Sequence, residues 1–124
     1  MTAQYRGFRT PLGTVVQTRG RSGTWYKLHH VIQHSPTGLE WGYGGSGPMD
    51  LATSILLHWL GHRRISPDLM IHSVPVSVLC QRFKWDVVAK LQSDRWKLTD
   101  NQLSQWLANT GIIFPVCPEE DVRD

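Results

Sequence analysis

Residues 34–59 read HSPTGLEWGYGGSGPMDLATSILLHW, in which a glycine-rich turn gives way to a helical pattern. The apolar residues that recur with helical spacing are Leu51, Ala52, Ile55, Leu56 and Trp59. This stripe predicts an amphipathic helix that ends at Gly61. We expect Gly47 to cap the helix and Pro48 to be its first residue, because the amide that proline lacks has no partner there. Asp50 then lies near the positive end of the helix dipole.

Upstream of this stretch the sequence is typical of short β-strands. Residues 4–9, 13–18 and 24–32 contain β-branched and aromatic residues, and turn residues separate them. They predict an antiparallel hairpin or a three-stranded meander. Residues 38–41, GLEW, predict a further short strand, because apolar and polar residues alternate there.

Downstream, a polar connector precedes two further helical patterns. One spans about 75–91, and the other begins at the capping box of Thr99 and Gln102 and ends at Gly111. Residues 111–116, GIIFPV, predict a last buried segment. The order of strands and then helices predicts an α+β fold, in which about three α-helices pack on one face of a small antiparallel β-sheet.

The length of 124 residues predicts a single domain. Its expected parts are a β-rich part with the glycine-rich loop (1–47), a helical part (48–110) and a C-terminal segment with a tail (111–124). No apolar run approaches the roughly 18 residues that a membrane span needs, and the N-terminal residues are too polar for a secretory signal. We therefore expect a soluble, cytoplasmic protein without a membrane partner. Cys80 and Cys117 form no C-x-x-C motif, so we expect two free thiols.

Positive charge is concentrated near the N-terminus. The net charge is +3, yet the first 39 residues contain no acidic residue and five basic ones, namely Arg6, Arg9, Arg19, Arg21 and Lys27. Aromatic residues lie among them, including Phe8 and Trp25. This segment suits nucleic acid, because cations hold phosphates and aromatic rings stack on exposed bases. The alternative is an edge hairpin that its arginines keep soluble and unpaired.

The glycine segment GYGGSGP, residues 42–48, is not one of the named phosphate-binding loops. It lacks the lysine of a P-loop, its formal G-x-G-x-x-G match lacks a βαβ context, and Pro48 breaks the serine elbow G-x-S-x-G. Free amides at the start of the helix can still bind an anion, with the Ser46 hydroxyl beside them. The alternative is a tight turn whose glycines fit under a neighbouring tryptophan.

Two further alternatives involve catalysis or a metal. Ser46 or Ser35 could be activated by a nearby His34, although no acid partner is visible. His58 and His62 have the i, i+4 spacing of metal ligands, but a tryptophan replaces the general base of H-E-x-x-H. The alternative is a pair of histidines placed favourably at a helix C-terminus. We therefore expect no cofactor and no metal, and we favour a protein without catalysis of its own.

Three segments together resemble a known family, namely residues 34–56, residues 82–91 (RFKWDVVAKL) and residues 96–107 (WKLTDNQLSQWL). With the opening YRGFRTPLGTVV they are similar to the bacterial and mobile-element proteins of domain-of-unknown-function family 6166. The resemblance covers about residues 5–107. It implies that the glycine motif is a family pattern, and it implies no activity. Leu39 and Met49 depart from that pattern, in which an aromatic and a small residue are usual.

We predict a small non-catalytic binding protein that contacts nucleic acid or a nucleic-acid-handling complex. The 34–48 loop and the basic N-terminal hairpin are expected to form one surface. The alternative is a phage- or plasmid-encoded inhibitor or accessory factor that docks on a host defence (CRISPR-type) or replication complex, with tryptophans as interface anchors. The third interpretation is a nucleotide or phosphoester hydrolase or transferase that uses His34 and Ser46. The candidate binding residues are Arg6, Arg9, Arg19, Arg21, Trp25, Lys27, His34, Ser35, Trp41, Tyr43, Gly44, Gly45, Ser46, Gly47, Arg63 and Arg64.

Overall fold

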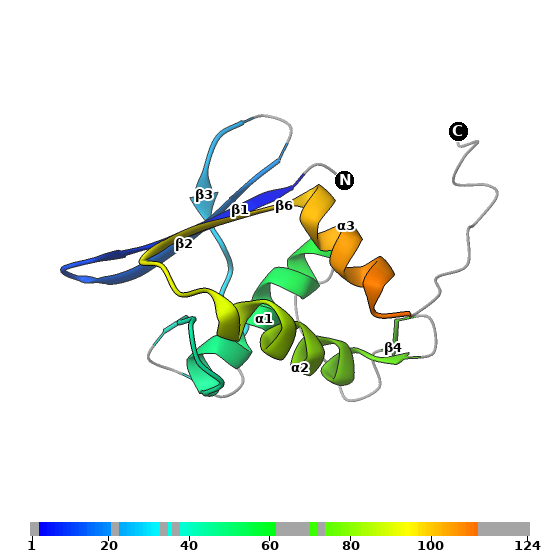
Figure 1. Cartoon of the computed structure of the whole chain (residues 1–124). Helices are drawn as coiled ribbons and strands as arrows, with labels where there is room; N and C mark the ends of the chain where they lie inside the picture. Colours follow the sequence, from blue (N-terminus) through cyan, green and yellow to red (C-terminus); the bar gives the residue numbers. More distant parts are fainter. Residues whose placement is uncertain are drawn as a thin grey trace.

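Within the described residues, a four-stranded antiparallel sheet forms one layer, and three α-helices lie against one of its faces (Figure 1). The structure is a computed structural model that describes residues 3–20, 23–32, 35, 38–61, 70–71 and 74–111. The strands, in their order across the sheet, are β3 (Tyr26–Lys27), β2 (Gly13–Arg19), β1 (Gln4–Thr10) and β6 (Arg95–Thr99). The helices are α1 (Ser46–Trp59), α2 (Val76–Asp86) and α3 (Asp100–Asn109). The predicted α+β class is confirmed.

The predicted hairpin of β1 and β2 is present, but the fourth strand is not the one that the sequence indicated. β1 and β2 pair in antiparallel register along their whole length. The second neighbour of β1 is β6, in which Arg95 lies opposite Phe8, so a strand interrupts the part that we expected to be helical. Residues 38–41 form no strand. Their carbonyls bond to side chains instead, as when Thr14 Oγ1 donates to the Leu39 carbonyl at 2.7 Å.

Helix α1 starts earlier than predicted. Gly45 is the N-cap in place of Gly47, and Pro48 is the third helical residue in place of the first. Proline is still tolerated there, because the first helical amides have no partner within the helix. Asp50 therefore lies beyond the first turn, which contains no acidic residue. The C-terminal end agrees with the prediction, since the helix stops just before Gly61, whose φ is +86°.

The other helices were predicted with unequal success. α2 ends at Asp86 instead of continuing to about residue 91, and the 3-10 turn η1 (Val88–Lys90) follows it. The capping box of α3 is confirmed, because the Gln102 amide donates to Thr99 Oγ1 at 3.2 Å and the Thr99 amide donates to Gln102 Oε1 at 2.8 Å. Most of the connector before α2 lies outside the described residues. Its described part contains two short strands that pair with each other, β4 (Met70–Ile71) and β5 (Val74–Pro75). Residues 112–116 also lie outside them.

Helix α1 is the centre of the hydrophobic core. All its residues from Gly47 to Leu57 are buried, whereas the sequence predicted burial of one stripe only. The polar residues on its other faces form internal hydrogen bonds, and Ser54 Oγ, for example, accepts from the Val31 amide at 2.9 Å. The inner face of the sheet and the helices complete the core with Tyr5, Val16, Phe83, Trp96, Leu98, Leu103 and Trp106. In the described ranges, no helix is long and apolar enough to cross a bilayer.

Cys80 is a free thiol in this core, on α2. Burial is the main cause that raises the pKa of its thiol to about 11, so the reactive thiolate is scarce at ordinary pH. We expect iodoacetamide to label Cys80 much more slowly in the native protein than in denaturant at about pH 8. The measurement uses Cys117→Ser, which leaves one thiol to count. Equal labelling rates in the two conditions would contradict the burial of Cys80.

Candidate nucleic-acid interface

The outer face of the sheet, on the side away from the helices, carries a row of basic side chains. Arg6 on β1 lies opposite Gln17 on β2 and Lys97 on β6, and Gln17 lies opposite Lys27 on β3. Residues directly opposite one another project from the same face of a sheet. Because Tyr5 next to Arg6 is fully buried against the helices, Arg6 and its row face outward.

We define the basic sheet face as five cations and two aromatic rings, namely Arg6, Arg19, Lys27, Arg95, Lys97, Phe8 and Trp25. Two of its arginines donate hydrogen bonds to neutral glutamine side chains. Arg6 Nε donates to Gln17 Oε1 at 2.8 Å, and Arg19 donates to Gln4 Oε1 at 3.1 and 3.2 Å. The two guanidinium carbons lie 4.1 and 4.5 Å from the centre of the Trp25 ring. These contacts orient the cations and leave their charge uncompensated.

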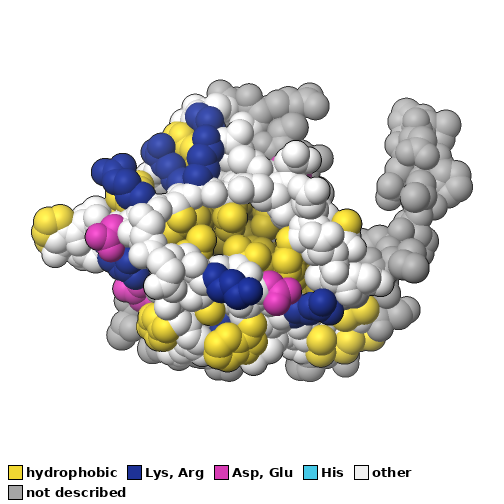
Figure 2. Space-filling model, in the orientation of Figure 1, with side chains coloured by type: hydrophobic (Ala, Val, Ile, Leu, Met, Phe, Trp, Pro, Cys, Tyr) yellow, Lys and Arg dark blue, Asp and Glu magenta, His cyan; other side chains and the backbone are white. Residues whose placement is uncertain are grey.

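The described carboxylates lie elsewhere in the molecule. They are Glu40 and Asp94, which bind Arg9, the buried Asp50, Asp86 beside Arg82 and Trp106, and Asp100 beside Trp59. Figure 2 shows Lys and Arg side chains gathered above the sheet, at the upper left of the view, with hydrophobic side chains between them. Among the described residues, the basic sheet face is therefore a patch of one sign, which attracts anions.

A shallow depression of about 540 Å³ lies on this face. Its lining consists of Arg6, Gly7, Phe8, Arg95, Trp96 and Lys97. Arg6 and Arg95 each place the guanidinium carbon 5.9 Å from the centre of the Phe8 ring. The depression therefore combines the Phe8 ring with three cations on the outer face, while Trp96, which lies opposite Gly7, is buried on the inner face.

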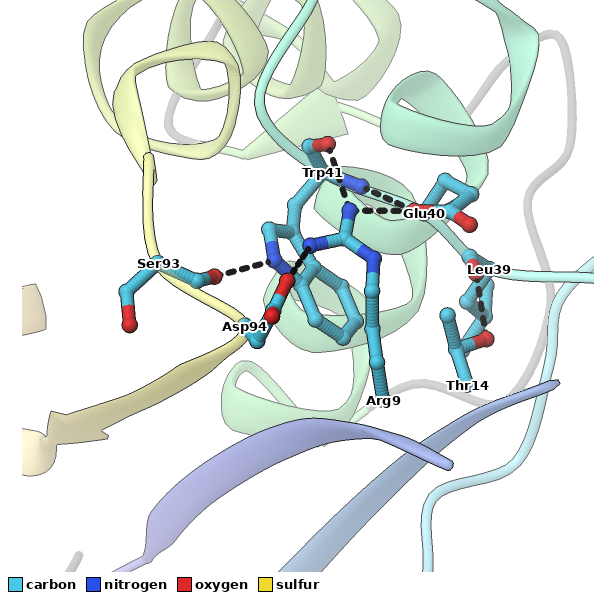
Figure 3. A network of polar contacts seen from close by, with 7 residues as sticks. All are labelled: Arg9, Thr14, Leu39, Glu40, Trp41, Ser93 and Asp94. Carbon is cyan, nitrogen blue, oxygen red and sulfur yellow. Dashed lines mark hydrogen bonds and ion pairs between the residues drawn. The ribbon is translucent and has the colours of Figure 1, made fainter. Parts of the chain in front are cut away.

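Arg9, a predicted binding residue, belongs to a different environment (Figure 3). Its guanidinium donates to Glu40 Oε1 at 2.8 Å and to Asp94 Oδ1 at 3.0 Å, and it lies 4.4 Å from the centre of the Trp41 ring. The hydrogen bond to Glu40 is the main cause that raises the pKa of Arg9. Two carboxylates neutralise this cation. Arg9 thus links β1 to residues 40–41, which precede the glycine segment, and to Asp94, which precedes β6.

The glycine segment lies on the helix side of the sheet. The Gly42 amide donates to the Val88 carbonyl at 3.0 Å, and Gly44 lies under Trp85, because a Cβ at Gly44 would be 2.2 Å from that ring. Lys84, which is 5% exposed, donates to the Gly44 carbonyl at 3.3 Å. This is the packing expected of a tight turn under a tryptophan. The amides of residues 44–47 form no hydrogen bond with another described residue.

The structure divides the predicted binding residues between two places. Arg6, Arg19, Trp25 and Lys27 lie on the basic sheet face, whereas the other described ones lie with the helices, namely Arg9, Ser35, Trp41, Tyr43, Gly44, Gly45, Ser46 and Gly47. The basic sheet face and the glycine segment therefore lie on opposite sides of the sheet. Arg21, His34, His62, Arg63 and Arg64 lie outside the described residues.

Two of the side chains that we considered for catalysis or metal binding, Ser35 and His58, have structural contacts. Ser35 Oγ donates to the Gly38 carbonyl at 2.9 Å, and its amide donates to Asp50 Oδ2 at 3.0 Å. His58 Nδ1 lies 2.7 Å from the Tyr5 hydroxyl, whose pKa is raised chiefly by burial, so the phenol keeps its proton. Over the described ranges, no three His, Cys, Asp or Glu residues are close enough to hold a metal.

Sequence reasoning missed Arg95 and Lys97 as site residues, and it noted Phe8 only as one of several rings. Arg95 and Lys97 alternate with the buried Trp96 and Leu98 in RWKLT, which is a strand pattern with a basic outer face. The capping box of Thr99 and Gln102 comes directly after this strand. Because it marks the start of a helix, we interpreted the region as helical. The alternation was the signal that could have placed these two cations beside Arg6.

One comparison with known proteins gave a match. Residues 5–109 match the model of a family described as Family of unknown function (DUF6166). No curated protein and no solved structure matches the chain. The match covers β1 to α3, so it includes the whole basic sheet face and the glycine segment.

Proposed function

The chain belongs to the Family of unknown function (DUF6166), which supplies no activity to transfer, and we propose from its own residues that it binds nucleic acid through the basic sheet face. The cations bind phosphates of the backbone, and the Phe8 ring contacts a base or a sugar. The observation that supports this most strongly is the register of the sheet. It aligns Lys27, Arg6 and Lys97 in one row across four strands.

The chemistry of the face favours phosphate over other anions. Five cations from four segments are spread over an open sheet, so several phosphates along one chain can be bound at once. Arginine also forms forked hydrogen bonds that match a phosphate group. A small single anion needs fewer cations and a deeper pocket.

Trp25 lowers the cost of binding by holding two cations in place. Its ring lies against Arg6 and Arg19, so these long side chains lose less rotamer freedom when they bind phosphate. Ordering a flexible side chain at an interface costs roughly 0.5–1.5 kcal/mol. The ring therefore supports affinity without contacting the ligand itself.

The test is a salt series of binding to a labelled oligonucleotide, measured by fluorescence anisotropy. We expect the logarithm of the association constant to fall linearly with the logarithm of salt concentration between about 50 and 200 mM. The double variant Arg95→Gln/Lys97→Gln should bind more weakly, and its slope should be smaller by about 0.7 per lost phosphate contact with a single strand. Both residues are exposed, so the fold should be unaffected.

The matched control is Arg82→Gln/Lys90→Gln, which removes the same charge from the helix layer. We expect its affinity and slope to equal those of the parent protein. Absence of binding at low salt, or equal weakening by the two double variants, would sink the proposal, because the face would then have no specific part in binding.

A further inference from the structure

Phe8 occupies a distinct position on the basic sheet face. It projects outward from β1, between the cross-strand neighbours Val15 on β2 and Arg95 on β6. Its side chain is half-buried and lines the depression of about 540 Å³. This volume lies within the range of roughly 300–1,000 Å³ that is typical of small-molecule sites. The depression can therefore receive one planar group of the size of a base.

Phe8 and Trp25 differ in what already contacts them. The guanidinium carbons of Arg6 and Arg19 lie 4.1 and 4.5 Å from the centre of the Trp25 ring, which is the distance of direct contact. The arginines near Phe8 lie at 5.9 Å, close to the limit of about 6 Å for a cation–π interaction. Trp25 does not line the depression. Phe8 is thus the ring that remains available for a ligand.

The surroundings of Phe8 match the parts of a nucleotide. The ring offers a stacking surface, while Arg6, Arg95 and Lys97 around it offer cations for the adjoining phosphates. A base can stack on a protein ring only when it is unpaired and free of its neighbours. In a duplex the bases are paired and stacked, so the Phe8 ring in the depression can reach only the outside of the double helix.

We infer that the basic sheet face prefers single-stranded nucleic acid and that Phe8 stacks on one of its bases. The inference rests on the proposed function and adds the class of substrate. Phosphate contacts alone serve single strands and duplexes alike, whereas the ring contact serves the single strand only. A preference for single strands therefore has to depend on Phe8.

The experiment compares a single strand with a hairpin duplex of the same composition, using three proteins. The unaltered protein should bind the single strand more tightly. Phe8→Leu, which keeps the apolar bulk and removes the ring, should lose about tenfold in single-strand affinity and keep its duplex affinity. Phe8→Trp, which keeps a ring, should retain the single-strand affinity. Equal denaturation midpoints of the three proteins establish that the fold is intact.

A second measurement does not depend on any variant. The unaltered protein should bind a single strand of abasic sites about as weakly as Phe8→Leu binds the normal strand. If neither strand nor duplex binds at low salt, the proposed function fails and the inference with it. If both bind, but the abasic strand binds as well as the normal one or Phe8→Leu weakens both ligands equally, the proposed function stands and the single-strand inference fails.

Discussion

Replacing Asp50 by alanine is expected to lower the free energy of unfolding by about 2–4 kcal/mol, since each buried donor left unpaired costs about 1–3 kcal/mol. The Asp50 side chain is fully buried on α1. Its Oδ2 atom accepts from His30 Nε2 at 2.9 Å and from the Ser35 amide at 3.0 Å. Alanine leaves both donors without this acceptor and opens a cavity between α1 and the chain that precedes it.

The measurement is equilibrium denaturation followed by tryptophan fluorescence. Asp94→Ala is the matched control, because it also removes a carboxylate that accepts a hydrogen bond from a side-chain nitrogen, but from a side chain that is 83% exposed. It should cost less than about 1 kcal/mol, as exposed ion pairs usually do. Asp50→Asn should be intermediate, since the amide oxygen still accepts a hydrogen bond. Equal losses for Asp50→Ala and Asp94→Ala would refute the anchoring role of Asp50.

The role of Asp50 shows why only part of the fold could be predicted from the sequence. An acid just after a proline indicated a charge at the helix dipole, which is a local effect. The structure instead uses Asp50 to hold a segment about 15–20 positions upstream. Local signals located the C-terminal end of α1 and the cap of α3 well, because the residues that specify these ends are neighbours in sequence. Pairing between β1 and β6 joins residues about 90 positions apart, and no local pattern specifies it.

The candidate site was predictable to a similar extent. The excess of positive charge and rings near the N-terminus identified Arg6, Arg19 and Trp25. Composition could not predict that Arg6 and Arg9 lie in different environments, because both belong to one strand and have the same side chain. The alternation of the strand turns Arg9 towards the helix side, where distant carboxylates bind it. The register with β6 then supplies Arg95 and Lys97, so half of the depression comes from the other end of the chain.

Gly7→Ala is expected to destabilise the protein by about 1–3 kcal/mol, the usual cost of overpacking a core. Gly7 lies in the middle of β1, opposite Val16 and Trp96. A Cβ there would be 2.5 Å from two carbons of the Trp96 indole, which packs edge-on against the Trp41 ring at 5.5 Å and cannot easily move. From sequence alone we would expect Gly7→Ala to stabilise the protein, because glycine inside a strand usually costs about 0.5–1 kcal/mol relative to alanine.

Gly20→Ala is the control for the backbone effect of this substitution. A Cβ at Gly20 has no atom within 4 Å, and its φ is not in the left-handed region, so alanine should be neutral or slightly stabilising.

Trp96→Phe should relieve the clash, because the smaller ring leaves room. It also removes Trp96 Nε1, which is buried and has no hydrogen-bond partner among the described residues. We therefore expect the double variant Gly7→Ala/Trp96→Phe to be more stable than the sum of the two single losses predicts, by about 0.5–3 kcal/mol. The measurement is denaturant unfolding. If the stability losses of the two single variants simply add in the double variant, the contact between residue 7 and Trp96 does not limit the size of residue 7.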